Sequence, residues 1–340
     1  KPVTPAYIPD YQLPEQITIC GETIPLENRD VYERMDYEFL LAAHSRLQVF
    51  LWLRRAARYF PYIEKKLAEE GLPQDLKYLA VAESDLRPTV RSPANAVGVW
   101  QFMQFTAKKY GLRKDEDFDE RQHFERSTDA ALKYLRRLHD MFGTWTLAMA
   151  AYNCGEGCVG KAVKEQEVRD YFRLYLPAET MRYVFRIAAV KILVENPDKY
   201  GYRMDPGLVY PPLTVDEVTV DLAQEVHLTR AAKAIGTDFK VLKELNPWIL
   251  GSHLPQGRYN LWTPVGLGDQ LVAFLKSTAP AATDKTGSGG GSSVVASYTV
   301  HRGDTLFKIS RQTGVPVETL RELNNIHGDE LLVGQQIRLK

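Results

Sequence analysis

One carboxylic acid, Glu83, stands where the sequence predicts the buried face of a helix. The predicted helix covers Pro73–Ser84, and its apolar stripe follows the spacing i, i+3, i+4 and i+7 through Leu76, Leu79, Ala80 and Glu83. Burial withdraws water from a carboxyl and raises its pKa, which keeps the group partly protonated near neutral pH. A carboxyl in that state suits general acid catalysis. A core Glu paired with Arg or Lys is the alternative, and this helix alone does not decide between them.

The helix of Glu83 belongs to an all-α block that we predict over residues 30–205. Apolar residues recur there at helical spacing. One helix is expected to end at Gly143, and Thr144 can cap the next one. A further helix is expected over residues 179–195. Residues 1–29 are rich in Pro and Tyr, and we expect them to form an extended N-terminal arm.

The pattern changes after this block to two small α+β modules with the order β-α-α-β. The first is predicted over residues 213–265 and the second over 297–340, and Leu-x-x-Leu-Asn recurs in both, at 242–246 and 320–324. Between them, residues 277–296 are rich in Gly and Ser, which is typical of a flexible linker. The predicted fold is therefore multidomain.

Composition and charge exclude several functional classes. The 43 basic residues balance 43 acidic ones, which argues against nucleic acid as the main partner. No run reaches the ~18 apolar residues of a transmembrane helix. The three cysteines are Cys20, Cys154 and Cys158, and the last two could form a disulfide or simply be two small residues. No His lies near them to complete a metal site, so neither a metal nor another cofactor is expected.

Several motifs in the helical block resemble family 1 lytic transglycosylases of the membrane-bound D type. Their order and spacing carry the resemblance, which rests on Gly71-Leu72-Pro73, Tyr78-Leu79-Ala80, Glu83-Ser84, the loop Ser92–Met103, Tyr110-Gly111-Leu112, Ala150–Asn153 and Glu179-Thr180. Two positions depart from the family pattern. Gln104 replaces the usual Pro after Phe-Met, and Cys154 replaces the usual Ala after Tyr-Asn.

The resemblance implies a lysozyme-like catalytic domain that acts on peptidoglycan. It implies cleavage of the β-1,4 bond between N-acetylmuramic acid and N-acetylglucosamine, with formation of a 1,6-anhydro sugar. Glu83 would first protonate the leaving oxygen and then take the proton of the C6 hydroxyl, while the 2-acetamido group assists. The substrate also implies a location in the periplasm or at the outer membrane.

The resemblance also implies a set of substrate-binding residues, each of which has a plain structural alternative. The set comprises Ser92, Gly98, Gln101, Met103, Tyr152, Asn153 and Glu179. Ser92 precedes a proline and suits a turn. Tyr152 and Asn153 end a helix, so Asn153 can serve as its C-cap. Glu179 suits the first turn of a helix.

The two β-α-α-β repeats resemble LysM modules, which bind glycans that contain N-acetylglucosamine. The copy at 297–340 matches over its full length, whereas the copy at 213–265 lacks Gly-Asp-Thr and resembles a degenerate module. In the second copy the resemblance implies a glycan groove flanked by Gly303, Asp304, Thr305, Leu306, Asn325 and Ile326. Asp304 and Thr305 are also good helix caps.

Two other functions remain open at this point. A muramidase that uses water would need a second carboxylate ~5–9 Å from Glu83. Asp85 is expected on the opposite side of the helix, and Asp115–Glu120 is a more distant source. A binding protein without turnover is the other alternative.

A disulfide between Cys154 and Cys158 would lie beside Tyr152-Asn153. It would fix the wall of the substrate cleft that the resemblance implies.

Overall fold

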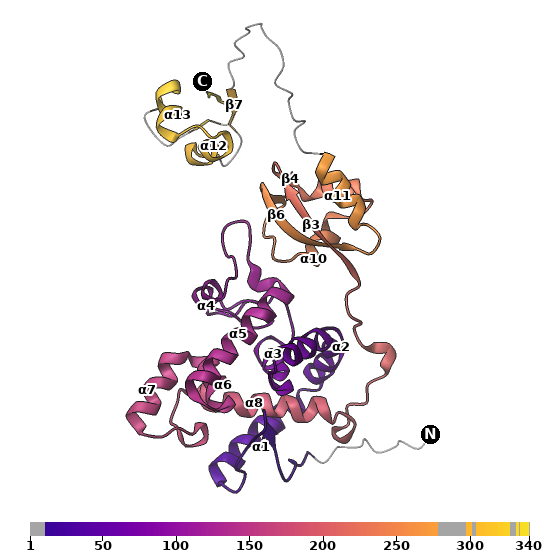
Figure 1. Cartoon of the computed structure of the whole chain (residues 1–340), viewed down its shortest axis with the longest axis vertical. Coiled ribbons are helices and arrows are strands. Elements are labelled where there is room, and N and C mark those ends of the chain that lie inside the picture. Colours follow the sequence, from indigo (N-terminus) through magenta and orange to yellow (C-terminus); the bar gives the residue numbers. More distant parts are fainter. Residues whose placement is uncertain (1–10, 278–296, 301–303, 327–330, 333, 340) are drawn as a thin grey trace. The chain divides into compact units, whose positions relative to one another are not determined.

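A computed structural model describes residues 11–277, 297–300, 304–326, 331–332 and 334–339 (Figure 1). The described residues fall into two compact units, one on each side of residues 278–296, so the predicted linker, apart from Ser277, lies outside the described residues. Within the described ranges, no helix is long and apolar enough to cross a membrane.

The first part of the larger unit is helical. Its helices are α1 (Arg29–His44), α2 (Arg46–Glu69), α3 (Lys77–Ser84), α4 (Gln104–Lys109), α5 (Phe124–Phe142), α6 (Trp145–Cys154), α7 (Glu156–Gln166) and α8 (Ala178–Glu195). Short 3-10 turns occur at Gln74–Leu76, Glu120–Gln122, Tyr171–Arg173, Asp198–Tyr200 and Pro206–Leu208. The predicted helix of Glu83 therefore begins as a 3-10 turn and continues as α3.

Local capping explains why several helices begin and end where they do. Asn28 accepts a hydrogen bond from the Asp30 N–H at 3.0 Å and starts α1. Gly143 ends α5 in the left-handed region, with φ +81°, and Thr144 accepts a 3.4 Å bond from the Leu147 N–H at the start of α6. Both of the last two features agree with the sequence prediction.

Helix α8 is the centre of this domain. It packs against α1, α3 and α6, and Figure 1 shows it passing beside all three. Ten of its 18 residues are buried, so it is apolar on most sides. This packing brings α8 next to the helix that carries Glu83 and next to the end of α6.

The described part of the N-terminal arm is not simply extended. Residues Thr18–Ile19 (β1) and Glu22–Thr23 (β2) form a short hairpin whose neighbours Ile17 and Ile24 are buried in the helical core. Glu22 accepts hydrogen bonds from the Thr146 N–H at 3.0 Å and the Thr146 hydroxyl at 2.8 Å. A carboxylate at the N-terminus of α6 satisfies donors that the helix itself leaves unpaired.

The first β-α-α-β module follows in the same unit. It contains β3 (Val215–Leu222), β4 (Val226–His227), α9 (Leu228–Ala234), α10 (Phe239–Leu245), β5 (His253–Leu254) and β6 (Gly257–Pro264). β3 and β6 pair antiparallel, with Val218 opposite Leu261. A further helix that the sequence did not predict, α11 (Gly268–Ser277), packs on β3 and adds Leu271 and Leu275 to the core. The packed module thus extends beyond residue 265.

The C-terminal module forms the smaller unit. It contains β7 (Ser297–Thr299), α12 (Leu306–Thr313), α13 (Val317–Asn324) and β8 (Gln336–Arg338), and β7 pairs antiparallel with β8. Asn324 donates to the Leu320 and Arg338 carbonyls and accepts from the Arg338 N–H. Asn246 makes the equivalent three bonds with Leu242 and Trp262 in the first module. The predicted repeat therefore has one shared structural clamp.

The contact of Glu22 with α6 generates a stability prediction. We expect Glu22→Ala to lower the free energy of unfolding by about 1–3 kcal/mol, because charged acceptors of buried donors are lost. Glu22→Gln keeps one acceptor oxygen and should cost less. Urea denaturation followed by circular dichroism measures both, and equal midpoints for all three proteins would refute the capping role.

Candidate active site

Glu83 lies on the last turn of α3, at the wall of a cavity. The cavity has a volume of about 310 Å³ and is lined by residues of α1, α2, α3 and α8. Ser84 ties the end of α3 to the following loop, because its hydroxyl contacts the carbonyls of Ala80 at 3.1 Å and Val99 at 2.7 Å. Glu83 itself is half-buried and is one of the residues that line this cavity.

The environment of Glu83 raises its pKa to about 7. Burial is the largest cause, because it removes water from the charged form, and the charge of Glu179 acts in the same direction. The hydrogen bond from the Tyr183 hydroxyl and the charge of Arg186 oppose the rise. The bonded partner of Glu83 is therefore a phenol rather than a basic side chain. A raised pKa is the direction that the helical stripe predicted.

Two tyrosines lie near this carboxyl, Tyr183, which is buried, and Tyr152, which is half-buried. Tyr183 donates to Glu83 from α8, and Tyr152 donates from α6 to the Trp100 carbonyl at 2.7 Å. Burial raises the pKa of both phenols well above the usual value, so both stay neutral. Tyr152 lies near enough to Glu83 for the carboxylate charge to raise its pKa, but its hydroxyl supports the loop that contains Trp100.

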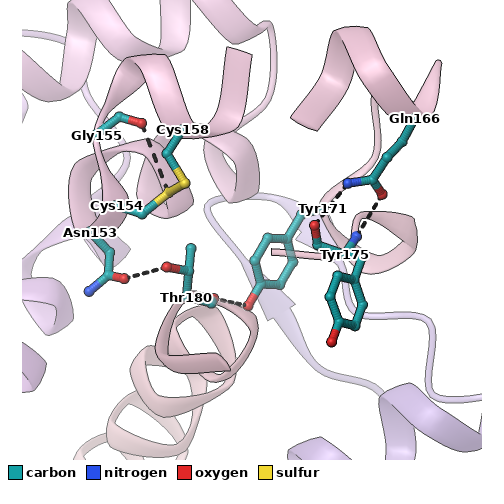
Figure 2. Close-up of a disulfide and its surroundings, with 8 residues drawn as sticks. All are labelled: Asn153, Cys154, Gly155, Cys158, Gln166, Tyr171, Tyr175 and Thr180. Atoms are coloured by element: carbon teal, nitrogen blue, oxygen red, sulfur yellow. Dashed lines mark hydrogen bonds between the residues drawn. A yellow bond between two sulfur atoms is a disulfide. The ribbon is translucent and has the colours of Figure 1, made fainter. Parts of the chain in front are cut away.

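Asn153 lies beside a disulfide at the end of α6. Its side-chain oxygen accepts a 2.7 Å bond from the Thr180 hydroxyl at the start of α8, and Figure 2 shows this bond next to the Cys154–Cys158 disulfide. The Thr180 carbonyl in turn accepts from the Tyr171 hydroxyl at 2.8 Å. Asn153 therefore joins α6 to α8, and the disulfide joins α6 to α7.

The loop between α3 and α4 carries four of the predicted site residues. Gln101 has φ +47° and donates to the Gly98 carbonyl at 2.8 Å, so its side chain closes the loop on itself. Ser92 accepts from the Ala96 N–H at 3.0 Å, which is the turn role. Met103 is 47% exposed just before α4 and can offer an apolar surface.

Gly98 is the tightest point of this loop. Its φ of +91° favours glycine, and a Cβ there would lie 1.9 Å from the Arg121 carbonyl oxygen. The group that approaches Gly98 closely is therefore the protein's own backbone. Through this contact the loop packs against the segment that precedes α5.

The acidic neighbours of Glu83 are already engaged. Glu179 is exposed in the first turn of α8, 3.9 Å from Arg186, which fits its structural alternative. Asp85 ends α3 with φ +54° and accepts from Trp52 at 2.7 Å and from Gln48 at 2.9 Å. Asp85 is thus a half-buried structural acceptor, and, contrary to the expectation that it faces away from Glu83, it lines the same cavity.

Three residues of this site were missed by the sequence analysis. Tyr183 contacts Glu83 directly, and Arg186 acts on its charge. Glu38 of α1 is only 3% exposed and pairs with Arg182 and Arg186 of α8. The i, i+4 pair of arginines in a largely apolar helix was the available signal.

In the C-terminal module, the loop before α12 has mainly structural contacts. Gly303 lies outside the described residues. Asp304 accepts from the Tyr298 hydroxyl at 2.9 Å, and Thr305 caps α12. Leu306 is 4% exposed and belongs to the module's core, so it packs beneath this loop instead of facing it.

The loop after α13 is more open. Asn325 is exposed and ends the helix with φ +52°, while Ile326 packs partly on the core. Asp304, Thr305 and Asn325 thus remain candidates for contact with a glycan.

A larger cavity lies elsewhere in the same unit. The cavity, of about 910 Å³, lies between α2, the start of α5 and α10, and its lining is largely aromatic and apolar. Glu83 is not part of it. Within the part of the chain that the structure describes, no cluster of three His, Cys, Asp or Glu side chains is placed to hold a metal.

Comparison with known families agrees with this arrangement. Residues 60–174 match the family model "Transglycosylase SLT domain", and residues 298–340 match "LysM domain". The chain therefore contains an SLT transglycosylase domain and a C-terminal LysM domain. The predicted resemblance, the helical lysozyme-like domain and the C-terminal module are confirmed. The individual site residues stay predictions.

Individual relatives extend the likeness. The chain is 34% identical to membrane-bound lytic murein transglycosylase D of Escherichia coli K12 over 84% of its own length, and it spans 64% of that relative. It is 37% identical to the peptidoglycan transglycosylase gp16 of Escherichia phage T7 over 30% of the chain and 8% of the relative. The solved 70 kDa soluble lytic transglycosylase Slt70 of E. coli aligns with 20% identity and a TM-score of 0.36, over 53% of this chain and 33% of that one.

The close contact between Gly98 and the Arg121 carbonyl leads to a second prediction. Gly98→Ala should lower the free energy of unfolding by at least about 2 kcal/mol, because the new Cβ clashes with backbone and the positive φ is strained. Gly157→Ala is the matched control, since its Cβ meets nothing within 4 Å in an exposed helix, and it should gain up to about 1 kcal/mol. Equal melting temperatures for the two variants in thermal unfolding would contradict this prediction.

Proposed function

We propose that this protein is a peptidoglycan lytic transglycosylase that uses Glu83 as its single acid and base. The observation that carries the proposal is the half-buried residue Glu83, with a pKa raised to about 7, on the wall of a cavity lined by α1, α2, α3 and α8. A carboxyl with that pKa exists in both protonation states near neutral pH. It can therefore give a proton in one step and take one in the next.

The proposed reaction has two proton transfers. Protonated Glu83 gives its proton to the glycosidic oxygen as the C1–O bond of the muramic acid breaks. The oxygen of the 2-acetamido group supplies electrons to C1 and forms a cyclic intermediate. The Glu83 carboxylate then removes the proton of the C6 hydroxyl, and O6 bonds to C1 as the bond between C1 and the acetamido oxygen breaks, which restores the 2-acetamido group. Glu83 ends protonated, and no water is consumed.

The neighbouring acids support a mechanism with one carboxyl. Glu38 is ion-paired with two arginines, and Asp85 accepts two hydrogen bonds. In the more distant segment Asp115–Glu120, Asp119 is ion-paired with Arg121, and Glu120 is ion-paired with Arg126. A hydrolase would need a second carboxylate that can activate water, and these groups are occupied by cations or donors.

The location and the second domain belong to the same proposal. A disulfide such as Cys154–Cys158 persists in oxidising compartments, which include the bacterial periplasm. The relative from E. coli K12 is described as membrane-bound. We infer that this protein acts in the periplasm or at the outer membrane. Its LysM domain would hold glycan and raise the local concentration of the enzyme on the polymer.

Replacement of the acid tests the chemistry. Glu83→Gln should lower the rate on purified sacculi by at least about 10³-fold, because both proton transfers are lost. Mass spectrometry of the wild-type products should show 1,6-anhydro ends. Glu165→Gln, at an exposed surface pair on α7, is the matched control and should keep full activity.

The same experiment separates the alternatives. Reducing muramic acid ends would indicate a muramidase instead of a transglycosylase. No products from the wild type, together with retained binding to sacculi, would indicate a binding protein.

The hydrogen bond from Tyr183 generates a prediction for the pH profile. Tyr183→Phe removes a donor that stabilises the charged form, so the pKa of Glu83 should rise above its value of about 7. Because the first step needs protonated Glu83, the fall of kcat/KM with rising pH should move to higher pH. The measurement is kcat/KM on sacculi between about pH 5 and pH 9.

Tyr152→Phe provides the comparison for this profile. The Tyr152 hydroxyl donates to the Trp100 carbonyl and not to Glu83, so the descending limb should keep its position even if the rate falls. Identical limbs for wild type and Tyr183→Phe would show that the phenol does not tune this acid.

A further inference from the structure

A side chain of the helical domain is buried inside the first β-α-α-β module. Phe118 has no exposed surface, stacks on Trp248 with ring centres 5.4 Å apart, and lies 5.4 Å from the ring of Tyr259. Both partners belong to the module. The guanidinium of Arg113 covers Phe118 at 3.9 Å from the ring centre. Phe118 therefore joins the module's core rather than the core of its own domain.

Backbone hydrogen bonds fix the same contact. The Asp119 N–H donates to the Trp248 carbonyl at 2.8 Å, and the Leu250 N–H donates to the Asp117 carbonyl at 2.7 Å. Phe118 and Ile249 form an antiparallel bridge between these two bonds. The module thus pairs with the helical domain as a neighbouring strand would, which sets its register as well as its position.

A buried ion pair leads from this contact to the active-site loop. Asp119 is fully buried and accepts two 2.8 Å bonds from Arg121, whose side chain is 2% exposed. The remaining nitrogen of Arg121 donates to the carbonyls of Asn95 at 3.0 Å and Phe102 at 3.1 Å. These two residues enclose the segment that contains Gly98. The Arg121 carbonyl closes on Gly98 itself.

The loop that makes the contact differs between the two copies of the repeat. Both copies use the same asparagine clamp, at Asn246 and Asn324. After Asn246 the loop contains Pro247, Trp248 and Ile249, and the last two are buried. After Asn324 the chain continues with an exposed Asn325. The apolar loop of the first copy therefore needs a covering partner, and the helical domain supplies it.

We propose that the first module is a built-in brace of the active site, in which Phe118 and Asp119 act as positioning residues for the loop 95–102. The module holds Phe118, Asp119 holds Arg121, and Arg121 holds both ends of the loop that presents Gln101. The consequence for turnover rests on the proposed function. The consequence for the loop's rigidity does not, because it can be measured without substrate.

Amide hydrogen exchange on the full chain tests the brace directly. Phe118→Ala should increase exchange of the loop amides Val97, Gly98 and Phe102 at least about 10-fold, because the network that orders them is released. Phe118→Leu keeps an apolar anchor and should restore most of the protection. Leu271→Ala is the matched control, since it removes the same kind of core contact from α11 and should leave the loop amides protected.

A second variant covers the case in which Phe118→Ala unfolds the module. Asp119→Asn leaves the contact between Phe118 and Trp248 in place and weakens the ion pairs of Asp119 with Arg121 and, at 3.6 Å, with Arg91 of the same loop region. It should also increase loop exchange, with the module amides still protected. Loop exchange unchanged in Asp119→Asn, or equally increased in Leu271→Ala, would overturn the proposal.

Activity on sacculi then separates the brace from the proposed function. With the loop released, kcat/KM should fall at least about 10-fold, and Phe118→Leu should recover it, because small misplacements in a site are costly. A released loop with unchanged turnover would leave the brace standing and refute the role of this loop in catalysis. A protected loop with lost turnover would refute the brace alone.

Discussion

The contact between the Glu83 carboxyl and the Tyr183 hydroxyl is the interaction on which this site depends. A carboxyl enclosed by protein loses hydration, and its charged form survives only where donors replace the water. Here one neutral donor replaces part of it, and the pKa settles at about 7. A cationic partner at hydrogen-bond distance would hold the acid ionised, and a fully apolar site would hold it neutral. One phenol leaves both states accessible.

That balance requires α3 and α8 to be held at a fixed distance. Tyr78 of α3 donates to Glu195 of α8 at 3.0 Å, which joins the two helices directly. Helix α8 is also held by Glu38 of α1, which pairs with Arg182 and Arg186, and by Asn153 of α6, which accepts from Thr180. Because α1 contributes Glu38, a helix outside the segment matched as the SLT domain takes part in setting the charge near Glu83. The residues that set the charge around Glu83 therefore extend beyond the segment that matches the family model.

The sequence predicted what depends on neighbours along the chain. The stripe ending at Glu83, the stop at Gly143 and the cap at Thr144 are local patterns, and Leu-x-x-Leu-Asn marked the repeat because Asn closes each copy. Tyr183 was missed because it lies 100 residues from Glu83 and its own helix is apolar on most sides. The pairing of Phe118 with Trp248 was missed for the same reason: tertiary packing decides it, and no local spacing records it.

The two repeats show how one clamp can support two opposed surfaces. A surface that binds glycan must stay exposed until the ligand arrives, whereas a surface that holds another domain must be covered permanently. Trp248 and Ile249 meet the second requirement, because loss of the covering domain would expose a large apolar area to water. Asn325, at the corresponding place in the second copy, is exposed. The loop after the clamp, and not the clamp itself, is therefore what differs between the two copies.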